Sequence, residues 1–206
     1  SVEAFLAAYG IEDPALRHFF TGLLTEVFHF QPRTPARALR NGEVIPLGSV
    51  TVEVLHTPGH TPGHLAFFFR EPGVLFLGDY DLTDFGPWYG DRDSSIALTR
   101  AAVARLRQVP ARIWIAGHGP GLFEAPPGER WDAYLAVIDD RERRLLEHLA
   151  QPRNIEEIVS AWITYLKPRE PLNFYRFGEQ ATMAKHLERL LREGRVVKEG
   201  EAYRRV

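Results

Sequence analysis

Two histidines and an aspartate each follow a short apolar run, in an arrangement suited to binding a metal ion. His60 lies within TPGHTPGH (57–64), Asp79 closes FLGD (76–79), and His118 follows IAG (115–117). Three strand ends would thus deliver two imidazoles and one carboxylate, a ligand set that suits zinc, iron or manganese. The sequence therefore predicts His60, Asp79 and His118 as metal ligands, with one or two Zn ions as the cofactor and Fe or Mn as the alternatives.

Four further residues are candidates for supporting the ligands or lining a substrate pocket: His64, Asp81, Trp88 and Tyr89. His64 opens the next strand and is expected to support the ligand loop, since a metal-binding histidine usually needs an orienting partner. Asp81 either orients a ligand or caps its loop. Trp88 and Tyr89 belong to an aromatic loop over residues 81–93, and they either wall a pocket or fill the core beneath the loop. The sequence assigns no catalytic residue.

In order along the chain, TPGHTPGH, LFLGD and AGHG resemble the later metal motifs of the metallo-β-lactamase superfamily, which includes glyoxalase II-like hydrolases. The resemblance spans about residues 44–121. It implies that His60 binds a first metal, that Asp79 bridges both metals and that His118 binds the second. It also implies an αββα sandwich, in which two β-sheets pack face to face between helices.

The first signature of that family, HxHxDH, does not occur in this chain, because no two histidines are separated by a single residue. The resemblance implies that each metal here keeps one histidine and the shared Asp79. Three explanations are open: the N-terminal half was removed or lies outside this chain, it belongs to another polypeptide, or this member is degenerate and binds no metal. A start at Ser1 within a helix-like stretch, with Met183 as the sole methionine, favours the first.

The elements that must position these residues are strands first and helices later. Apolar alternation and apolar runs predict strands over 49–55, 64–69, 74–77 and 112–116, and helical spacing predicts helices over 2–9, 14–27 and 94–108. After a break at 126–128, we expect helices over 129–149, 155–165 and 177–193 and a hairpin of 196–198 with 202–204. The fold class is therefore α+β, the C-terminal half of an αββα sandwich followed by a helical, winged-helix-like domain. The predicted domains are 1–139, metallo-β-lactamase-like with its N-terminal part missing, and 140–206.

Composition limits the class of protein. The 206 residues include no cysteine, which excludes a disulfide framework, a zinc ribbon and a thiol nucleophile. The apolar runs are far shorter than the roughly 20 residues of a membrane helix, so we expect a soluble, cytoplasmic protein with no membrane partner. The net charge of −2 hides a mildly basic C-terminal part, which is compatible with nucleic-acid binding but too weak to indicate it.

Two functions from different classes follow. The first is a metal-dependent hydrolase that activates a metal-bound water to attack an ester, thioester, lactone or phosphodiester, with this chain alone expected to be inactive. The alternative is a non-catalytic winged-helix module on a degenerate metallohydrolase remnant, binding nucleic acid or protein through a helix near residues 179–192. Because half a sandwich exposes the inner face of its sheet, we also expect a homo-oligomer or a complementing N-terminal segment.

Overall fold

The computed structural model describes residues 1–119 and 121–206, which form a mixed α+β structure. The helices are α1 (Val2–Ala8), α2 (Pro14–Gly22), the π-helical turn η1 (Leu23–Val27), α3 (Ile96–Leu106), α4 (Arg130–His148), α5 (Ile155–Ser160) and α6 (Leu172–Arg192). The strands are β1 (Val44–Leu47), β2 (Val50–His56), β3 (Leu65–Phe69), β4 (Val74–Phe76), β5 (Ile113–Ile115), β6 (Leu122–Phe123), β7 (Arg153–Asn154), β8 (Val196–Glu199) and β9 (Ala202–Arg205).

The larger sheet places the ends of three strands at one edge. Its order is β1-β2-β3-β4-β5-β6, and every neighbouring pair is antiparallel except β4 and β5. The parallel pair needs a crossover, which contains α3. Because β3 runs opposite to both of its neighbours, β2, β4 and β5 all point the same way. The segments that follow these three strands therefore meet at one edge, and they carry His60, Asp79 and His118.

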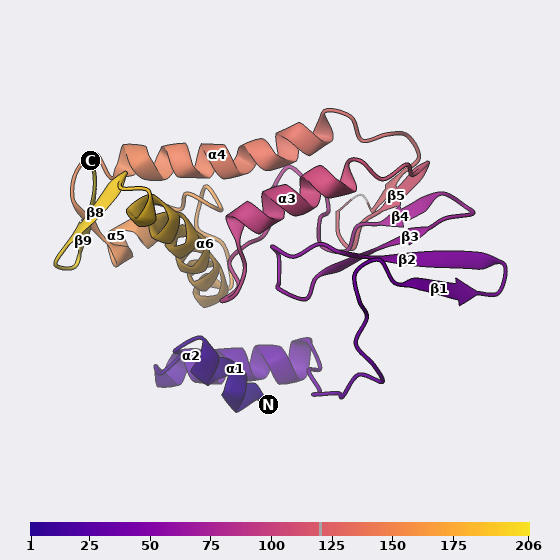
Figure 1. Ribbon diagram of the computed structural model, residues 1–206. Helices are drawn as coiled ribbons and strands as arrows, with labels where there is room; N and C mark the ends of the chain where they lie inside the picture. The colour runs from indigo at the N-terminus through magenta and orange to yellow at the C-terminus, as the bar shows by residue number, and fades with distance from the viewer. Residues whose placement is uncertain (120) are drawn as a thin grey trace.

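Helices cover one face of this sheet (Figure 1). Leu75 of β4 and Trp114 of β5 form a core with residues of α3 and α4, among them Val103 and Tyr134. Strand residues alternate between faces, so the neighbouring positions project to the other side. The register places Phe67, Phe76, Ile115 and Leu122 in one cross-strand row there.

The opposite face is the one expected to meet a second sheet. Leu122 is 52% exposed, and Ile115 is also exposed. Within the described residues the other sheet, of order β7-β9-β8, lies at the far end of the molecule (Figure 1). Within residues 1–119 and 121–206, the row is thus exposed at Ile115 and Leu122 and half-buried at Phe67 and Phe76, and the two sheets share no strand pairing.

Helix α4 connects the sheet region to the C-terminal part. Its first half packs into the sheet core through Trp131 and Tyr134, while Leu145 and Leu146 pack with α5, α6 and β8. The helix is continuous across residues 139 and 140, where we predicted a domain boundary, and that boundary stays a prediction. No helix in the described part of the chain has the length and apolarity to cross a bilayer.

The C-terminal elements follow the predicted order with shifted bounds. Helix α5 starts at a capping box of Asn154 and Glu157, but it ends at Ser160 rather than Tyr165. The reason is backbone geometry, since Trp162 and Leu166 adopt positive φ angles of 52° and 68°, which a helix cannot contain. Helix α6 begins earlier than expected, at Leu172.

The N-terminal helices pack on α6. Asp13 caps α2 and Pro14 occupies its first turn, as the sequence predicted. Phe20, Leu6 and Ile11 form a small buried cluster against Phe174 and Phe177 of α6. The segment beyond α2 widens into η1 and then leaves the helix with Phe28 exposed.

Candidate metal centre

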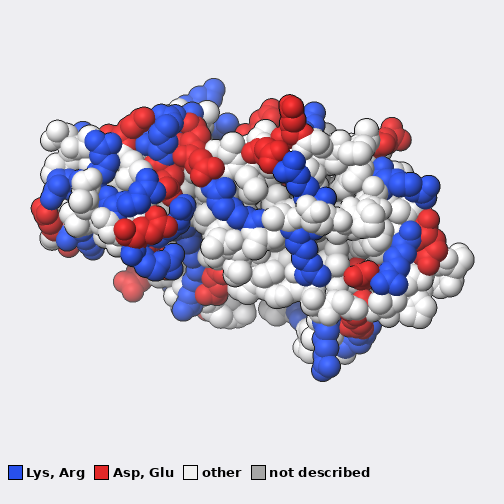
Figure 2. Space-filling view, turned by 45° about the horizontal axis from the view of Figure 1, so that its top comes forward, with Lys and Arg blue, Asp and Glu red and all other residues white. Residues whose placement is uncertain are grey.

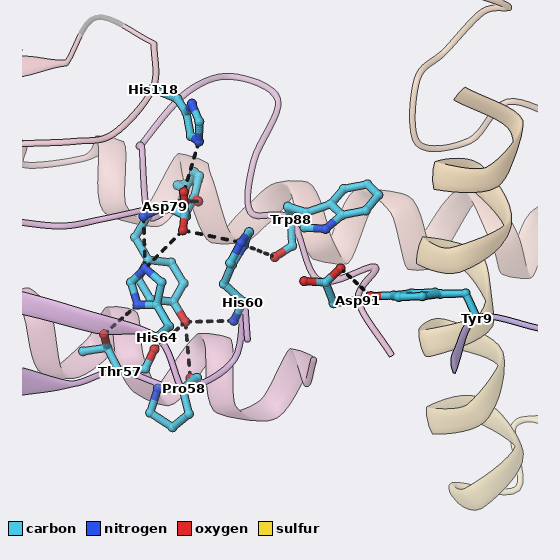
Figure 3. Close-up of polar contacts among 11 residues, drawn as sticks. Tyr9, Thr57, Pro58, His60, His64, Asp79, Trp88, Asp91 and His118 are labelled. Carbon is cyan, nitrogen blue, oxygen red and sulfur yellow. Dashed lines mark hydrogen bonds and ion pairs between the residues drawn. The ribbon is translucent and has the colours of Figure 1, made fainter. Parts of the chain in front are cut away.

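Asp79 lies between the two histidines predicted to bind metal (Figure 3). Its Oδ2 is 3.5 Å from Nε2 of His60, and its Oδ1 is 3.0 Å from Nε2 of His118. Each carboxylate oxygen therefore faces a different imidazole. The side chains of Asp79 and His118 are 38% and 67% exposed, so the cluster is open to solvent on the His118 side.

The orientation of His60 is set by a main-chain carbonyl. Nδ1 of His60 lies 3.3 Å from the carbonyl oxygen of Trp88, which can only accept, so we assign the proton to Nδ1. In the neutral ring, Nε2 then presents a lone pair to Oδ2 of Asp79. Two acceptors face each other across 3.5 Å. Such a pair is stabilised by a positive charge, either a proton on the ring or a bound cation.

His64 is held inside the protein by both of its ring nitrogens. Nε2 accepts a hydrogen bond from the main-chain N–H of Asp79 at 3.0 Å, and Nδ1 lies 2.8 Å from Oγ1 of Thr57. Burial lowers the pKa of His64, which favours the neutral ring. Gly78 makes room for it, because a Cβ there would lie 2.5 Å from Nε2 of His64. These contacts fix the backbone that presents Asp79.

Tyr80 fixes the loop that carries His60, a role that we did not predict. Its hydroxyl lies 3.2 Å from the carbonyl oxygens of Thr57 and Pro58, and it accepts from the N–H of His60 at 3.3 Å. Burial raises the pKa of Tyr80 to about 12, so the hydroxyl keeps its proton. The only sequence signal for this role was its place directly after Asp79.

Asp81 and Tyr89 make their hydrogen bonds away from His60 and His118. The carboxylate of Asp81 accepts from the N–H and the hydroxyl of Thr83, as in a capped loop. Tyr89 is fully buried, and its hydroxyl lies 2.9 Å from Nε2 of His186 on α6. The structure thus brings His60, His64, Asp79 and His118 together with the carbonyl of Trp88, but it does not bring the side chain of Tyr89 to them.

Arg141 anchors the aromatic loop and was also not predicted. Its guanidinium donates to the carbonyl oxygens of Phe85 and Pro87 at 2.7 and 3.1 Å, which holds the peptide segment leading to Trp88. A signal existed in the sequence. Arg141 lies on the inward stripe of α4 that includes Tyr134, Ile138 and Leu145, where a charged residue needs a buried partner.

The described residues do not by themselves form a complete metal site. No group of three or more histidine, aspartate or glutamate side chains within residues 1–119 and 121–206 is arranged to hold a metal ion. A catalytic zinc usually has three protein ligands, whereas each position here would have one imidazole and one oxygen of Asp79. The imidazole and carboxylate donors suit a metal such as zinc, iron or manganese, and further ligands would be needed to hold it.

The comparisons with known proteins identify the family of this chain. The family model described as "Metallo-beta-lactamase superfamily" matches residues 2–118. A hydroxyacylglutathione hydrolase of Haemophilus influenzae is 38% identical over 86 residues, which are 39% of each chain. An atrochrysone carboxyl ACP thioesterase of Pseudocercospora fijiensis is 24% identical over 151 residues, 72% of this chain and 43% of that protein.

The likeness to a solved structure extends over the whole chain. A metallo-beta-lactamase family protein of Thermus thermophilus superposes with a TM-score of 0.70 and 28% identity, covering 100% of this chain and 64% of that protein. The chain spans about two fifths of the length of the curated relatives described above. The match to the family model over more than half of the chain shows that it belongs to the metallo-beta-lactamase superfamily.

Proposed function

We propose that this chain supplies one part of a metal-dependent hydrolase, which uses an activated water to cleave an ester, thioester, lactone or phosphodiester. The observation that supports it is the position of Asp79, with Oδ2 facing His60 and Oδ1 facing His118. A carboxylate placed between two imidazoles is suited to joining two metal ions. Superfamily relatives that match this chain are hydrolases by name.

The proposed cofactor is zinc, one or two ions, with iron or manganese as alternatives. When bound, such ions lower the pKa of a water to about 7 and polarise the oxygen of the substrate. The missing ligands would come from a complementing N-terminal segment, which would also cover the exposed face of the sheet. A homo-oligomer is the alternative source of that cover.

The residues of this chain would hold the ligands in place. The carbonyl of Trp88 keeps the proton of His60 on Nδ1 and leaves Nε2 free as a donor of its lone pair. His64 and Tyr80 fix the main chain of Asp79 and His60. Because a shift of about 1 Å in such groups can cost a hundredfold in rate, these contacts serve positioning.

Among the substrate classes, we favour a thioester. The curated relatives include an ACP thioesterase, which matches 72% of this chain. The lactone, ester and phosphodiester readings remain alternatives within the same chemistry, because fold alone does not select among them.

The test is metal content and hydrolysis by the whole protein with Asp79→Ala. We expect loss of bound metal, measured by inductively coupled plasma mass spectrometry, and loss of thioesterase activity. Asp84→Ala is the matched control, since Asp84 is an exposed aspartate of the loop that follows Asp79. Equal metal content and equal activity in both variants would refute the proposal.

A second candidate is a binding module in the C-terminal part, favoured by the order β7, α5, α6, β8, β9, which resembles a winged helix. Several of its basic side chains already have partners. Lys185 donates to the carbonyl of Arg92, and Arg189 pairs with Glu142. On the face shown in Figure 2, basic and acidic groups are intermixed rather than gathered in one patch.

This second candidate has its own test, which is binding of the whole protein to duplex DNA followed by fluorescence anisotropy. A winged helix that contacts phosphates should lose affinity steeply between about 50 and 200 mM salt. Lys198→Ala on the β8-β9 hairpin should weaken binding and reduce the salt dependence. Absence of salt-sensitive binding to DNA and to RNA would remove the nucleic-acid form of the candidate.

A further inference from the structure

An aromatic cavity of about 250 Å³ lies between the N-terminal helices and α6. Phe5 and Phe20 contribute from α1 and α2, Phe28 from the segment after η1, and Phe174 and Phe177 from α6. These rings pack in tilted and edge-to-face pairs, such as Phe20 on Phe177 at 5.0 Å between centroids. The cavity is thus lined mainly by apolar and aromatic side chains.

Trp88 connects this cavity to the candidate metal centre. Its carbonyl oxygen accepts from Nδ1 of His60, and its indole ring lines the cavity. The ring packs closely on Gly90 and Gly178, where added Cβ atoms would lie 2.6 and 3.2 Å from it. One residue thus contacts a predicted ligand with its main-chain carbonyl (Figure 3) and also lines the cavity.

The charge inside the cavity selects for an uncharged occupant. Asp91 is the one ionisable carboxylate among the described lining residues, and it already accepts from the hydroxyl of Tyr9 at 3.0 Å. The same lining includes no lysine or arginine. A buried anion would meet a carboxylate and no cation, so the polar end of a ligand has to stay outside. The volume of the cavity is also slightly below the range of about 300–1,000 Å³ of drug-sized pockets, and this volume suits one hydrocarbon chain.

We propose that this cavity binds the hydrocarbon chain of an acyl substrate, of about medium length, while the bond to be cleaved lies at Asp79. The proposal rests on the proposed hydrolase and names its substrate class. Trp88 is common to both parts, because its main-chain carbonyl contacts His60 while the residue lines the cavity. The polar leaving group would remain on the solvent side, where His118 is exposed.

Binding can be measured without turnover. The whole protein is stripped of metal with EDTA and titrated with octanoate in a calorimeter, with hexanoate and butyrate for comparison. Each methylene that enters an apolar cavity should tighten binding by about fourfold, so octanoate, with two more methylenes, should bind about fifteenfold more tightly than hexanoate. Octanoate should still bind after the metal is removed, because the cavity recognises its hydrocarbon chain and not its carboxylate.

The chain offers a matched pair of variants. Phe28 lines the cavity and Phe30, two residues away, does not, and they are 59% and 43% exposed. We expect Phe28→Asp to weaken octanoate binding at least about tenfold by placing a charge at the cavity, and Phe30→Asp to leave it unchanged. Circular dichroism melts of both variants check that the fold is retained. If Phe28→Asp does not fold, Leu24→Gln, which also lines the cavity, takes its place.

The outcomes separate this proposal from the hydrolase. No binding of octanoate, no dependence on chain length, or equal effects of the two phenylalanine variants would overturn the acyl site. Chain-dependent binding in EDTA together with no hydrolysis of any acyl thioester by the metal-loaded protein would keep the acyl site and refute the hydrolase. Hydrolysis with a kcat/KM that does not depend on acyl length would keep the hydrolase and refute the acyl site.

Discussion

The hydroxyl of Tyr89 lies 2.9 Å from Nε2 of His186, which joins the aromatic loop to the middle of α6. Both side chains are fully buried. Arg141 of α4 adds a second contact, 3.3 Å from the same hydroxyl. The loop that presents the carbonyl of Trp88 to His60 is thus held by two helices of the C-terminal part.

Tyr89→Phe should therefore destabilise the protein. The substitution keeps the ring but leaves Nε2 of His186 without its partner in a buried position, at a cost of about 1–3 kcal/mol. Urea denaturation measures the free energy of unfolding. Tyr175→Phe, a partly exposed tyrosine of α6, is the control and should change it by less than about 0.5 kcal/mol. Equal effects would show that the Tyr89 hydroxyl has no special role.

Gly78→Ala should cost more stability than Gly48→Ala. Both glycines have nearly the same left-handed backbone, with φ of 62° and 64°, so both variants carry a strain of about 1–2 kcal/mol. Only at Gly78 would the new Cβ collide, 2.5 Å from Nε2 of His64, whereas nothing lies within 4 Å at Gly48. The difference in unfolding free energy between the two variants isolates the collision, and a difference near zero would mean that His64 moves without cost.

Local sequence patterns predicted where most strands lie, but they do not give the direction of the strands within the sheet. Alternation at Val50, Val52 and Val54 and the apolar runs located β2, β3, β4 and β5 within one or two residues, whereas β1 was not predicted. Three ends with ligand-type residues were visible in the sequence, and the parallel β4–β5 pair explains why they meet. The two-residue strands β6 and β7 are too short for a pattern to detect.

Only part of the site could be predicted, because several of its contacts depend on how distant segments pack together. Residue type and spacing identified His60, Asp79 and His118, which the structure places together, but whether they bind metal stays a prediction. The contacts of Tyr80 and Arg141 go to main-chain carbonyls, and those depend on tertiary packing rather than on any motif. Tyr89 was a candidate for the pocket because of its aromatic neighbours, yet its hydrogen bond lies on the side of α6.

The exposed sheet face should make this chain self-associate when it is prepared alone. Leu122 belongs to the apolar row of Phe67, Phe76 and Ile115, whose burial would be favourable by about 25 cal/mol per Å². Leu122→Glu should raise the fraction of monomer in analytical ultracentrifugation. Leu172→Glu at the start of α6, 41% exposed against 52% for Leu122, is the control and should have no effect. A monodisperse, cooperatively melting monomer of the unsubstituted chain would contradict this expectation.

The stability of the C-terminal part should fall in acid because of Glu142. The imidazole of His186, 3.6 Å away, and the guanidinium groups of Arg195 and Arg189, each 2.7 Å away, lower the pKa of Glu142 from 4.5 to about 2, against burial, which acts to raise it. A carboxyl whose pKa is lower in the folded state stabilises the fold above its unfolded pKa. This contribution is thus complete above pH 4.5 and is lost as the pH falls from 4.5 toward 2.

Urea denaturation between pH 7 and pH 3 measures this loss. In Glu142→Gln the part of the acid dependence that comes from this carboxyl should disappear, and the variant should be less stable than the unsubstituted chain at pH 7. Glu124→Gln, which changes an exposed glutamate after β6, should keep the full pH dependence.

His186 acts in the same direction as Glu142, because burial lowers the pKa of His186 and the unfolded chain takes up its proton first as the pH falls through 6.5. If Glu142→Gln keeps some acid dependence and the double variant Glu142→Gln with His186→Gln loses it, that remainder comes from His186. Identical pH profiles for Glu142→Gln and Glu124→Gln would show that the buried ion pairs of Glu142 do not contribute to stability.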